Sequence, residues 1–96
     1  MIYHLVWFKL KEEISREEIA QLQANVQEMA PQIPQAIEVA CGEDFSGRSR
    51  GFEFGLMAKF ASREDGQIYD KHPAHQAFIA KSKHLWTDVM ALDFEI

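Results

Sequence analysis

The stretch MIYHLVWFKL, residues 1–10, is rich in β-branched and aromatic side chains, which predicts a β-strand. Successive side chains of a strand point to opposite faces. Both faces of this strand are largely apolar, so we expect it to be covered on both sides. Helices of the same chain can cover one face, and the cover for the other must come from elsewhere. One face carries Ile2, His4, Val6, Phe8 and Leu10, and the other carries Tyr3, Leu5, Trp7 and Lys9.

A helix is predicted over residues 14–30. Ser15 is a favourable N-cap, and Glu18 follows three residues later, which is the pattern of a capping box. Apolar residues then recur at intervals of three or four, as on one face of a helix. Pro31 and Pro34 end the helix.

The rest of the chain predicts a hairpin, a broken helix and a last strand. Strands are expected over residues 35–44 and 52–60, joined by the polar loop 45–51. A second helical region begins at Ser62 and runs to about Asp70 or Lys71. Pro73 disfavours helical geometry at His72 but suits the first turn of a new helix, which we expect to continue to Leu85 or Trp86. Residues 87–96 close the chain as a fourth strand.

The element order is therefore β-α-β-β-α-β, which is typical of an α+β, ferredoxin-like fold. We expect one domain over residues 1–96, with a four-stranded antiparallel sheet and its helices on one face. The open face would carry Tyr3, Leu5, Trp7, Met57 and some of Met90, Leu92 and Phe94. An apolar sheet face of this kind predicts a homodimer formed sheet against sheet.

Composition excludes several classes of partner. The chain has 10 basic and 15 acidic residues, a net charge of -5, and no basic stripe. Binding to nucleic acid or to an anionic membrane is therefore not expected. The apolar N-terminal run lacks the features of a signal peptide and is too short to span a bilayer. With a single cysteine, Cys41, no intrachain disulfide can form, which indicates a reducing compartment such as the cytoplasm.

The candidate functional residues lie around the helix break, where YDKHPAH, residues 69–75, holds one phenol and two imidazoles. His75 can take a proton from carbon beside a carbonyl, or it can be a hydrogen-bonded core residue. Tyr69 can donate its hydroxyl to a ligand carbonyl, or it can simply pack. His4 shares the helix-covered layer with His75, which favours a common pocket. His72 is interpreted as a junction residue that bonds locally, and no third ligand completes a metal site with it and His75.

Several segments together resemble the stress-responsive dimeric α/β-barrel (Dabb) family. They are residues 4–10, the strand 51–60, the Tyr69…His72-Pro73-Ala74-His75 segment and residues 92–94. The resemblance implies a ferredoxin-like protomer whose sheets pair into a barrel-shaped homodimer, a dimeric α/β-barrel. A plant member of that family is a polyketide cyclase that closes a ring by an aldol reaction without a cofactor.

By that resemblance, His75 would be the general base, Tyr69 would orient the substrate, and His4 would line the pocket. The chain departs from the cyclase at Phe54, where the cyclase has a further pocket histidine. We expect a small apolar or aromatic carbonyl or phenol compound to bind between helices and sheet, without metal or cofactor. Further contacts are expected from Phe54, Phe78 and His72. The alternatives are a non-catalytic, stress-related binding or structural dimer and a cofactor-free monooxygenase.

Overall fold

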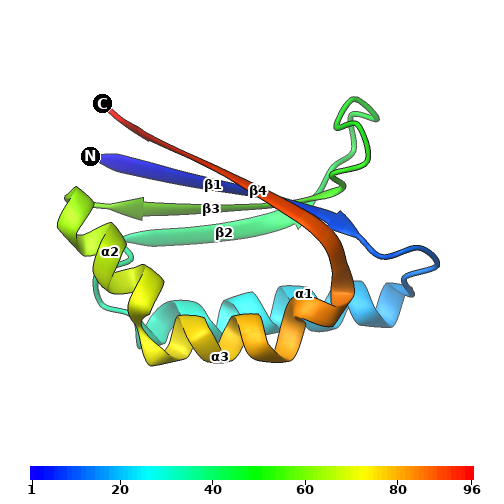
Figure 1. Cartoon of the computed structure of the whole chain (residues 1–96), viewed down its shortest axis with the longest axis horizontal. Coiled ribbons are helices and arrows are strands. Elements are labelled where there is room, and N and C mark those ends of the chain that lie inside the picture. The colour runs from blue at the N-terminus through cyan, green and yellow to red at the C-terminus, as the bar shows by residue number, and fades with distance from the viewer.

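A computed structural model describes residues 1–96, with the elements in the order predicted from the sequence (Figure 1). The sheet forms one layer and the helices form a second layer against one of its faces. The strands are β1 (Ile2–Leu10), β2 (Glu38–Glu43), β3 (Phe54–Phe60) and β4 (Trp86–Glu95). The helices are α1 (Arg16–Met29), α2 (Arg63–Lys71) and α3 (Pro73–Ser82), with short 3-10 turns η1 (Ala30–Gln32) and η2 (Lys83–Leu85).

The sheet is antiparallel with the strand order β2-β3-β1-β4, so β1 and β3 are the central neighbours as predicted. The register places Ile2 opposite Phe60 and Phe8 opposite Phe54. On its other side β1 pairs with β4, which forms one edge of the sheet. This topology confirms the ferredoxin-like α+β fold.

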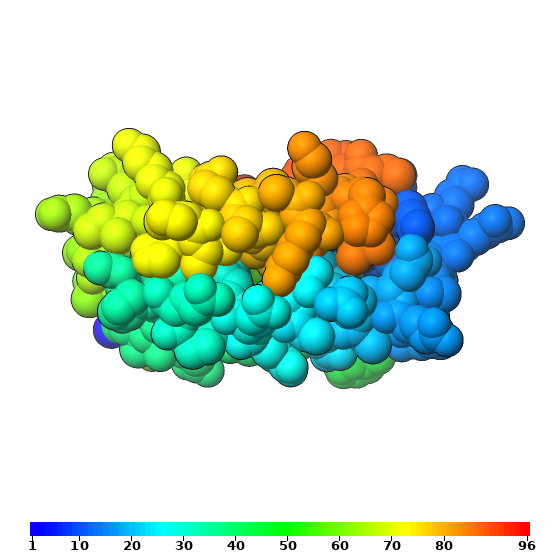
Figure 2. Space-filling view, turned by 90° about the horizontal axis from the view of Figure 1, so that it is seen from below, coloured from blue at the N-terminus to red at the C-terminus, as the bar shows by residue number.

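The core fills the space between the sheet and the helices. Its largest fully buried side chains are Phe54, Phe60, Leu22, Met29 and Ile33. Figure 2 shows α1 and α3 side by side across the underside of the sheet. The predicted capping box is present, because the Ser15 side chain accepts from the Glu18 backbone N–H and Glu18 accepts from the Ser15 N–H.

The break between α2 and α3 also follows the prediction. His72 has extended backbone angles (φ -62°, ψ 138°) and serves both as the C-cap of α2 and as the N-cap of α3. Its Nδ1 accepts a hydrogen bond from the Ala74 backbone N–H at 3.0 Å, and Pro73 occupies the first position of α3. The proline therefore separates α2 from α3, as predicted.

Several boundaries differ from the predicted ones: α1 spans Arg16–Met29 rather than residues 14–30, α3 ends at Ser82, and three strands begin at other residues. β2 begins at Glu38 rather than at residue 35, because a turn at residues 34–35 and a bend at Ile37 come before it. β3 begins at Phe54 rather than at residue 52, where the Phe52 N–H closes a turn onto the Ser49 carbonyl at 3.2 Å. β4 begins one residue early, at Trp86. No helix is long and apolar enough to cross a membrane.

The second face of the sheet is open and apolar, as predicted. Trp7 of β1 and Leu92 of β4 retain 46% and 57% of their accessible surface. Tyr3 stacks on Phe94 across the same face, with ring centroids 5.5 Å apart. The helices pack mainly on β1, β2 and β3, so the edge strand β4 is exposed on both faces.

Candidate functional site

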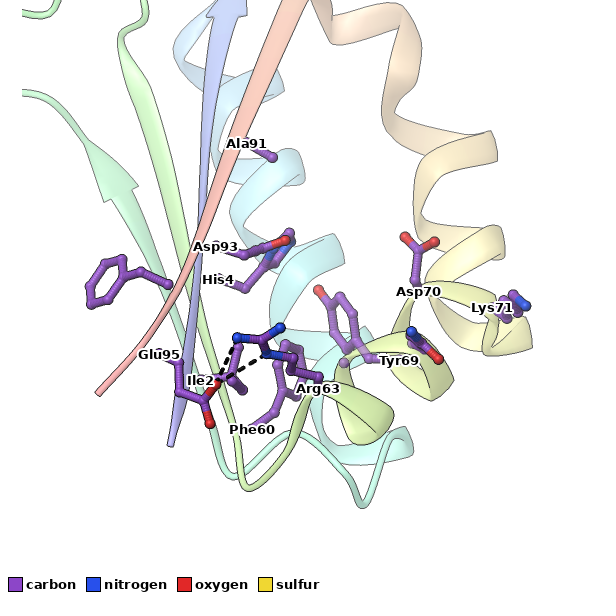
Figure 3. A pocket seen from close by; sticks show the side chains of 13 residues that line it. Ile2, His4, Phe60, Arg63, Tyr69, Asp70, Lys71, Ala91, Asp93 and Glu95 are labelled. Atoms are coloured by element: carbon purple, nitrogen blue, oxygen red, sulfur yellow. Dashed lines mark hydrogen bonds and ion pairs between the residues drawn. The ribbon is translucent and has the colours of Figure 1, made fainter.

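A cleft of about 640 Å³ lies between α2 and the exposed edge strand β4 (Figure 3). We call it the α2–β4 cleft. It forms there because the helices leave the inner face of β4 uncovered. Its walls come from β1, the end of β3, α2 and β4. The residues that line it are Ile2, His4, Phe60, Arg63, Gly66, Gln67, Tyr69, Asp70, Lys71, Ala91, Asp93, Phe94 and Glu95.

Tyr69 is the most buried polar side chain of the cleft, with 2% of its surface exposed. Its ring packs on Phe60 at 5.0 Å between centroids, and its hydroxyl points into the cleft (Figure 3). No group of the chain hydrogen-bonds to this hydroxyl, which is therefore free for a ligand. Burial, with a contribution from the charge of Asp70, raises the pKa of Tyr69 to about 12. The phenol thus stays protonated near neutral pH and can donate a hydrogen bond.

His75, in the first turn of α3, packs against the C-terminal end of α2. Its ring lies 4.6 Å from that of Tyr69 between centroids, although His75 is not among the residues that line the cleft. Its Nδ1 lies 3.0 Å from the Asp70 carbonyl oxygen. A carbonyl can only accept, so Nδ1 carries the proton and Nε2 keeps a lone pair. Burial lowers the pKa of His75, only partly offset by the Asp70 carbonyl and carboxylate, which favours a neutral ring.

His4 lies on the helix-facing side of β1, as predicted, and its ring meets Tyr69 edge-on at 5.9 Å. Its Nδ1 pairs with the carboxylate of Asp93, which stands directly opposite in β4. The sequence did not single out Asp93 as a functional residue. The one available signal was alternation, which places Asp93 on the same face of β4 as Val89 and Ala91.

The remaining predicted contact residues have other neighbours. Phe54 and Phe78 are core residues, with 0% and 4% of their surface exposed, and the Phe54 ring meets Phe8 edge-on. The His72 side chain caps α3. None of the three lines the α2–β4 cleft, and their roles in ligand binding stay predictions.

A metal site would need several ligands close together. No group of three or more His, Cys, Asp and Glu side chains has that arrangement.

The loop 45–51 borders a second cavity of about 610 Å³ beside Trp7 and Met90, at the far end of the sheet from α2 (Figure 1).

Comparisons with known proteins agree with this architecture. An uncharacterized protein of Streptomyces coelicolor is 32% identical over 98 residues, covering 99% of each chain. A dimeric ferredoxin-like protein of unknown function from Thermobifida fusca superposes with a TM-score of 0.87 at 21% identity, covering 99% of this chain and 90% of that one. The hydroxynitrile lyase of Passiflora edulis also gives 0.87 at 21% identity, covering 99% and 92%. Residues 2–96 match the sequence profile of the stress responsive A/B barrel domain, Dabb, and the chain therefore belongs to this family.

Proposed function

We propose that a small apolar or aromatic carbonyl or phenol compound binds in the α2–β4 cleft against Tyr69 and extends past the Tyr69 ring to His75, which lies just outside the cleft lining. We propose further that the protein catalyses a cofactor-independent proton transfer on it, as a cyclase or a lyase does. The observation that carries the proposal is the pairing of two complementary groups. Tyr69 offers a protonated hydroxyl, and His75, with its ring 4.6 Å away, offers an unprotonated Nε2. A hydrogen-bond donor and a neutral base side by side are what removal of a proton beside a carbonyl requires.

In the cyclase reaction, Tyr69 donates its O–H to the substrate carbonyl oxygen. Nε2 of His75 takes a proton from the adjacent carbon, and the electron pair moves into an enolate that the Tyr69 hydrogen bond stabilises. The enolate carbon attacks a second carbonyl of the same molecule, which forms the ring bond. The alkoxide produced recovers the proton from the His75 imidazolium, so the reaction is balanced without any cofactor.

A lyase reaction can use the same two groups, and the similar Passiflora edulis structure is a hydroxynitrile lyase. His75 would take the hydroxyl proton of a cyanohydrin as its carbon–cyanide bond breaks. The carbonyl oxygen that forms would accept the Tyr69 hydrogen bond. The cyanide ion would leave with the proton from His75. Cyclase and lyase therefore differ in substrate and share the base and the donor.

We propose that the chain forms a homodimer through the open face of its sheet. The exposed Trp7 and Leu92 support this, because a small protein rarely leaves such a patch in water. The similar structure from Thermobifida fusca is dimeric. Light scattering should give twice the chain mass, and Leu92→Glu should reduce it to the mass of one chain. We also propose a cytoplasmic location, in keeping with the single free thiol of Cys41.

The catalytic proposal is tested with His75→Gln and Tyr69→Phe, assayed on poly-β-ketone substrates and on mandelonitrile. We expect His75→Gln to lower kcat/KM by about 100- to 10,000-fold, the usual contribution of a general base. Tyr69→Phe removes one donor to a developing oxyanion and should cost about 100-fold or more. The control is His84→Gln, because His84 is exposed and lies at η2, outside the cleft. Wild-type turnover in both test variants would overturn the mechanism.

Non-catalytic binding is the second candidate, and Phe54 favours it. By the family resemblance, this fully buried phenylalanine takes the place of a histidine that lines the pocket of the plant cyclase, so this chain has an apolar ring at that position. A pure binding protein would lose ligand affinity in Tyr69→Phe while showing no turnover in any form of the chain.

A further inference from the structure

Asp93 lines the α2–β4 cleft but has no role in the proposed reaction. It lies on β4, directly opposite His4 of β1, and points toward the inner side of the sheet (Figure 3). Its carboxylate pairs with His4 Nδ1 and with no other side chain. The Asp93 side chain is 62% exposed, whereas that of His4 is 20% exposed. Asp93 therefore reaches from the cleft wall to a ring that is mostly enclosed.

The chemistry of the pair fixes where the His4 proton lies. A carboxylate only accepts hydrogen bonds, so His4 Nδ1 must carry the proton. In the neutral ring the lone pair is then on Nε2, which has no partner within the chain. The Asp70 carbonyl imposes the same tautomer on His75. Two imidazoles in one tautomer thus flank the ring of Tyr69, with centroids 5.9 and 4.6 Å from it.

We infer that Asp93 is a positioning residue: it holds His4 in the Nδ1–H tautomer, so that Nε2 accepts a hydrogen bond from a hydroxyl of the ligand. This inference rests on the ligand cleft proposed above and narrows its ligand class. Tyr69 provides a donor for a carbonyl, and His4 provides an acceptor for a phenol or enol. The ligand should therefore carry both a carbonyl and a hydroxyl group.

The charges of the cleft favour an uncharged ligand. Asp70, Asp93 and Glu95 contribute three carboxylates to its walls. Of the two cations, Arg63 is engaged by Glu95 at 3.0–3.1 Å, and Lys71 points away from the cleft (Figure 3). A carboxylate-bearing ligand would meet uncompensated negative charge there, which lowers its affinity.

The tautomer of His4 can be observed directly in the intact protein. Nitrogen-correlated NMR spectra of the histidine rings, recorded at about pH 8.5, distinguish Nδ1–H from Nε2–H in the neutral ring. We expect Nδ1–H for His4. In Asp93→Asn the amide can donate to Nδ1, and we expect the population to shift to Nε2–H. Glu95→Gln, two residues along the same face and paired with Arg63 instead, should leave the His4 tautomer unchanged.

Ligand binding supplies the second readout, with para-hydroxyacetophenone and para-methoxyacetophenone as probes. They share ring and carbonyl, but only the first has a hydroxyl donor. We expect the wild-type chain to bind the hydroxyl compound about 10-fold more tightly, the effect of about one hydrogen bond. Asp93→Asn should abolish this preference. The anionic para-hydroxybenzoate should bind more weakly than para-hydroxyacetophenone.

The outcomes separate this inference from the proposed catalysis. An unchanged His4 tautomer in Asp93→Asn, or equal affinity of the wild-type chain for the two ketones, overturns the role of Asp93. Neither readout depends on turnover, so a protein without cyclase or lyase activity can still confirm it. Conversely, loss of turnover in His75→Gln with no tautomer change in Asp93→Asn would keep the catalytic proposal and refute the inference.

Discussion

Truncation of Phe54 tests whether this residue belongs to the core or to a ligand pocket. The side chain is 0% exposed, so Phe54→Ala removes a completely buried ring. Such substitutions cost about 3–5 kcal/mol of unfolding free energy. The edge-to-face contact with Phe8, 5.9 Å between centroids, adds aromatic pairing that alanine cannot replace. We therefore expect the upper half of the range, about 4–5 kcal/mol.

That loss is large for a chain of this length. A domain of 96 residues is stable by about 5–14 kcal/mol in total. With a urea dependence of about 2 kcal/mol per molar, the unfolding midpoint should fall by about 2 M. The assay is urea unfolding followed by tryptophan fluorescence at one fixed protein concentration, because a dimer would make the midpoint concentration-dependent.

Phe45→Ala is the matched control for Phe54→Ala. It makes the same chemical change at a ring that is fully exposed on the loop 45–51. We expect a change within about 0.5 kcal/mol. A loss below about 1 kcal/mol for Phe54→Ala would refute the core assignment, and a weaker ligand affinity alongside it would identify a pocket residue. Equal losses of unfolding free energy in both variants would show that the difference in burial between Phe54 and Phe45 does not determine their contributions to stability.

Three further predictions concern stability. Ser82→Ala removes the hydroxyl oxygen that accepts a hydrogen bond from the buried Asn25 amide at 2.9 Å. The unfolding free energy, measured with urea, should fall by about 1–3 kcal/mol, and adding Asn25→Leu should recover part of this loss. The bond from Lys11 lowers the pKa of Glu18 from its ordinary 4.5 to about 2, so the stability that Glu18 contributes is present above pH 4.5 and is lost toward pH 2. Glu18→Gln should therefore flatten the acid limb of the thermal stability profile. Burial lowers the pKa of His75, so protonation favours the unfolded chain and the unfolding free energy falls as pH drops through about 6.5. The His75→Gln variant should therefore lose less unfolding free energy than the wild-type chain between pH 8 and pH 5.

The fold was predictable because its signals are local. The strand period of residues 1–10, the capping box at Ser15 and the helix break at Pro73 each depend on a few adjacent residues. The boundaries were wrong by one to three residues where turns compete with strands. At residue 52 the backbone closes a turn that neither hydrophobicity nor propensity indicates.

The candidate site was predictable only in part. Alternation and helical periodicity brought His4 and His75 to one layer, and their rings do flank Tyr69. The hydrogen-bond partners that fix their tautomers were not foreseen. His75 bonds to a backbone carbonyl, which any residue type would offer at position 70. His4 meets Asp93 through the register of β1 on β4, although the two residues are 89 positions apart in the sequence. No local pattern sets that register.

The position of β4 explains why an acidic side chain can face inward at this site. A carboxylate on β1 or β3 would lie beneath the helices, where burial without partners is costly. β4 is the edge strand that the helices leave uncovered, so Asp93 keeps 62% of its side-chain surface in water while it pairs with His4. Tyr69, 2% exposed, closes the apolar core just behind this pair. The border between the covered and the uncovered strand therefore places a buried phenol and a solvated carboxylate on either side of the His4 imidazole.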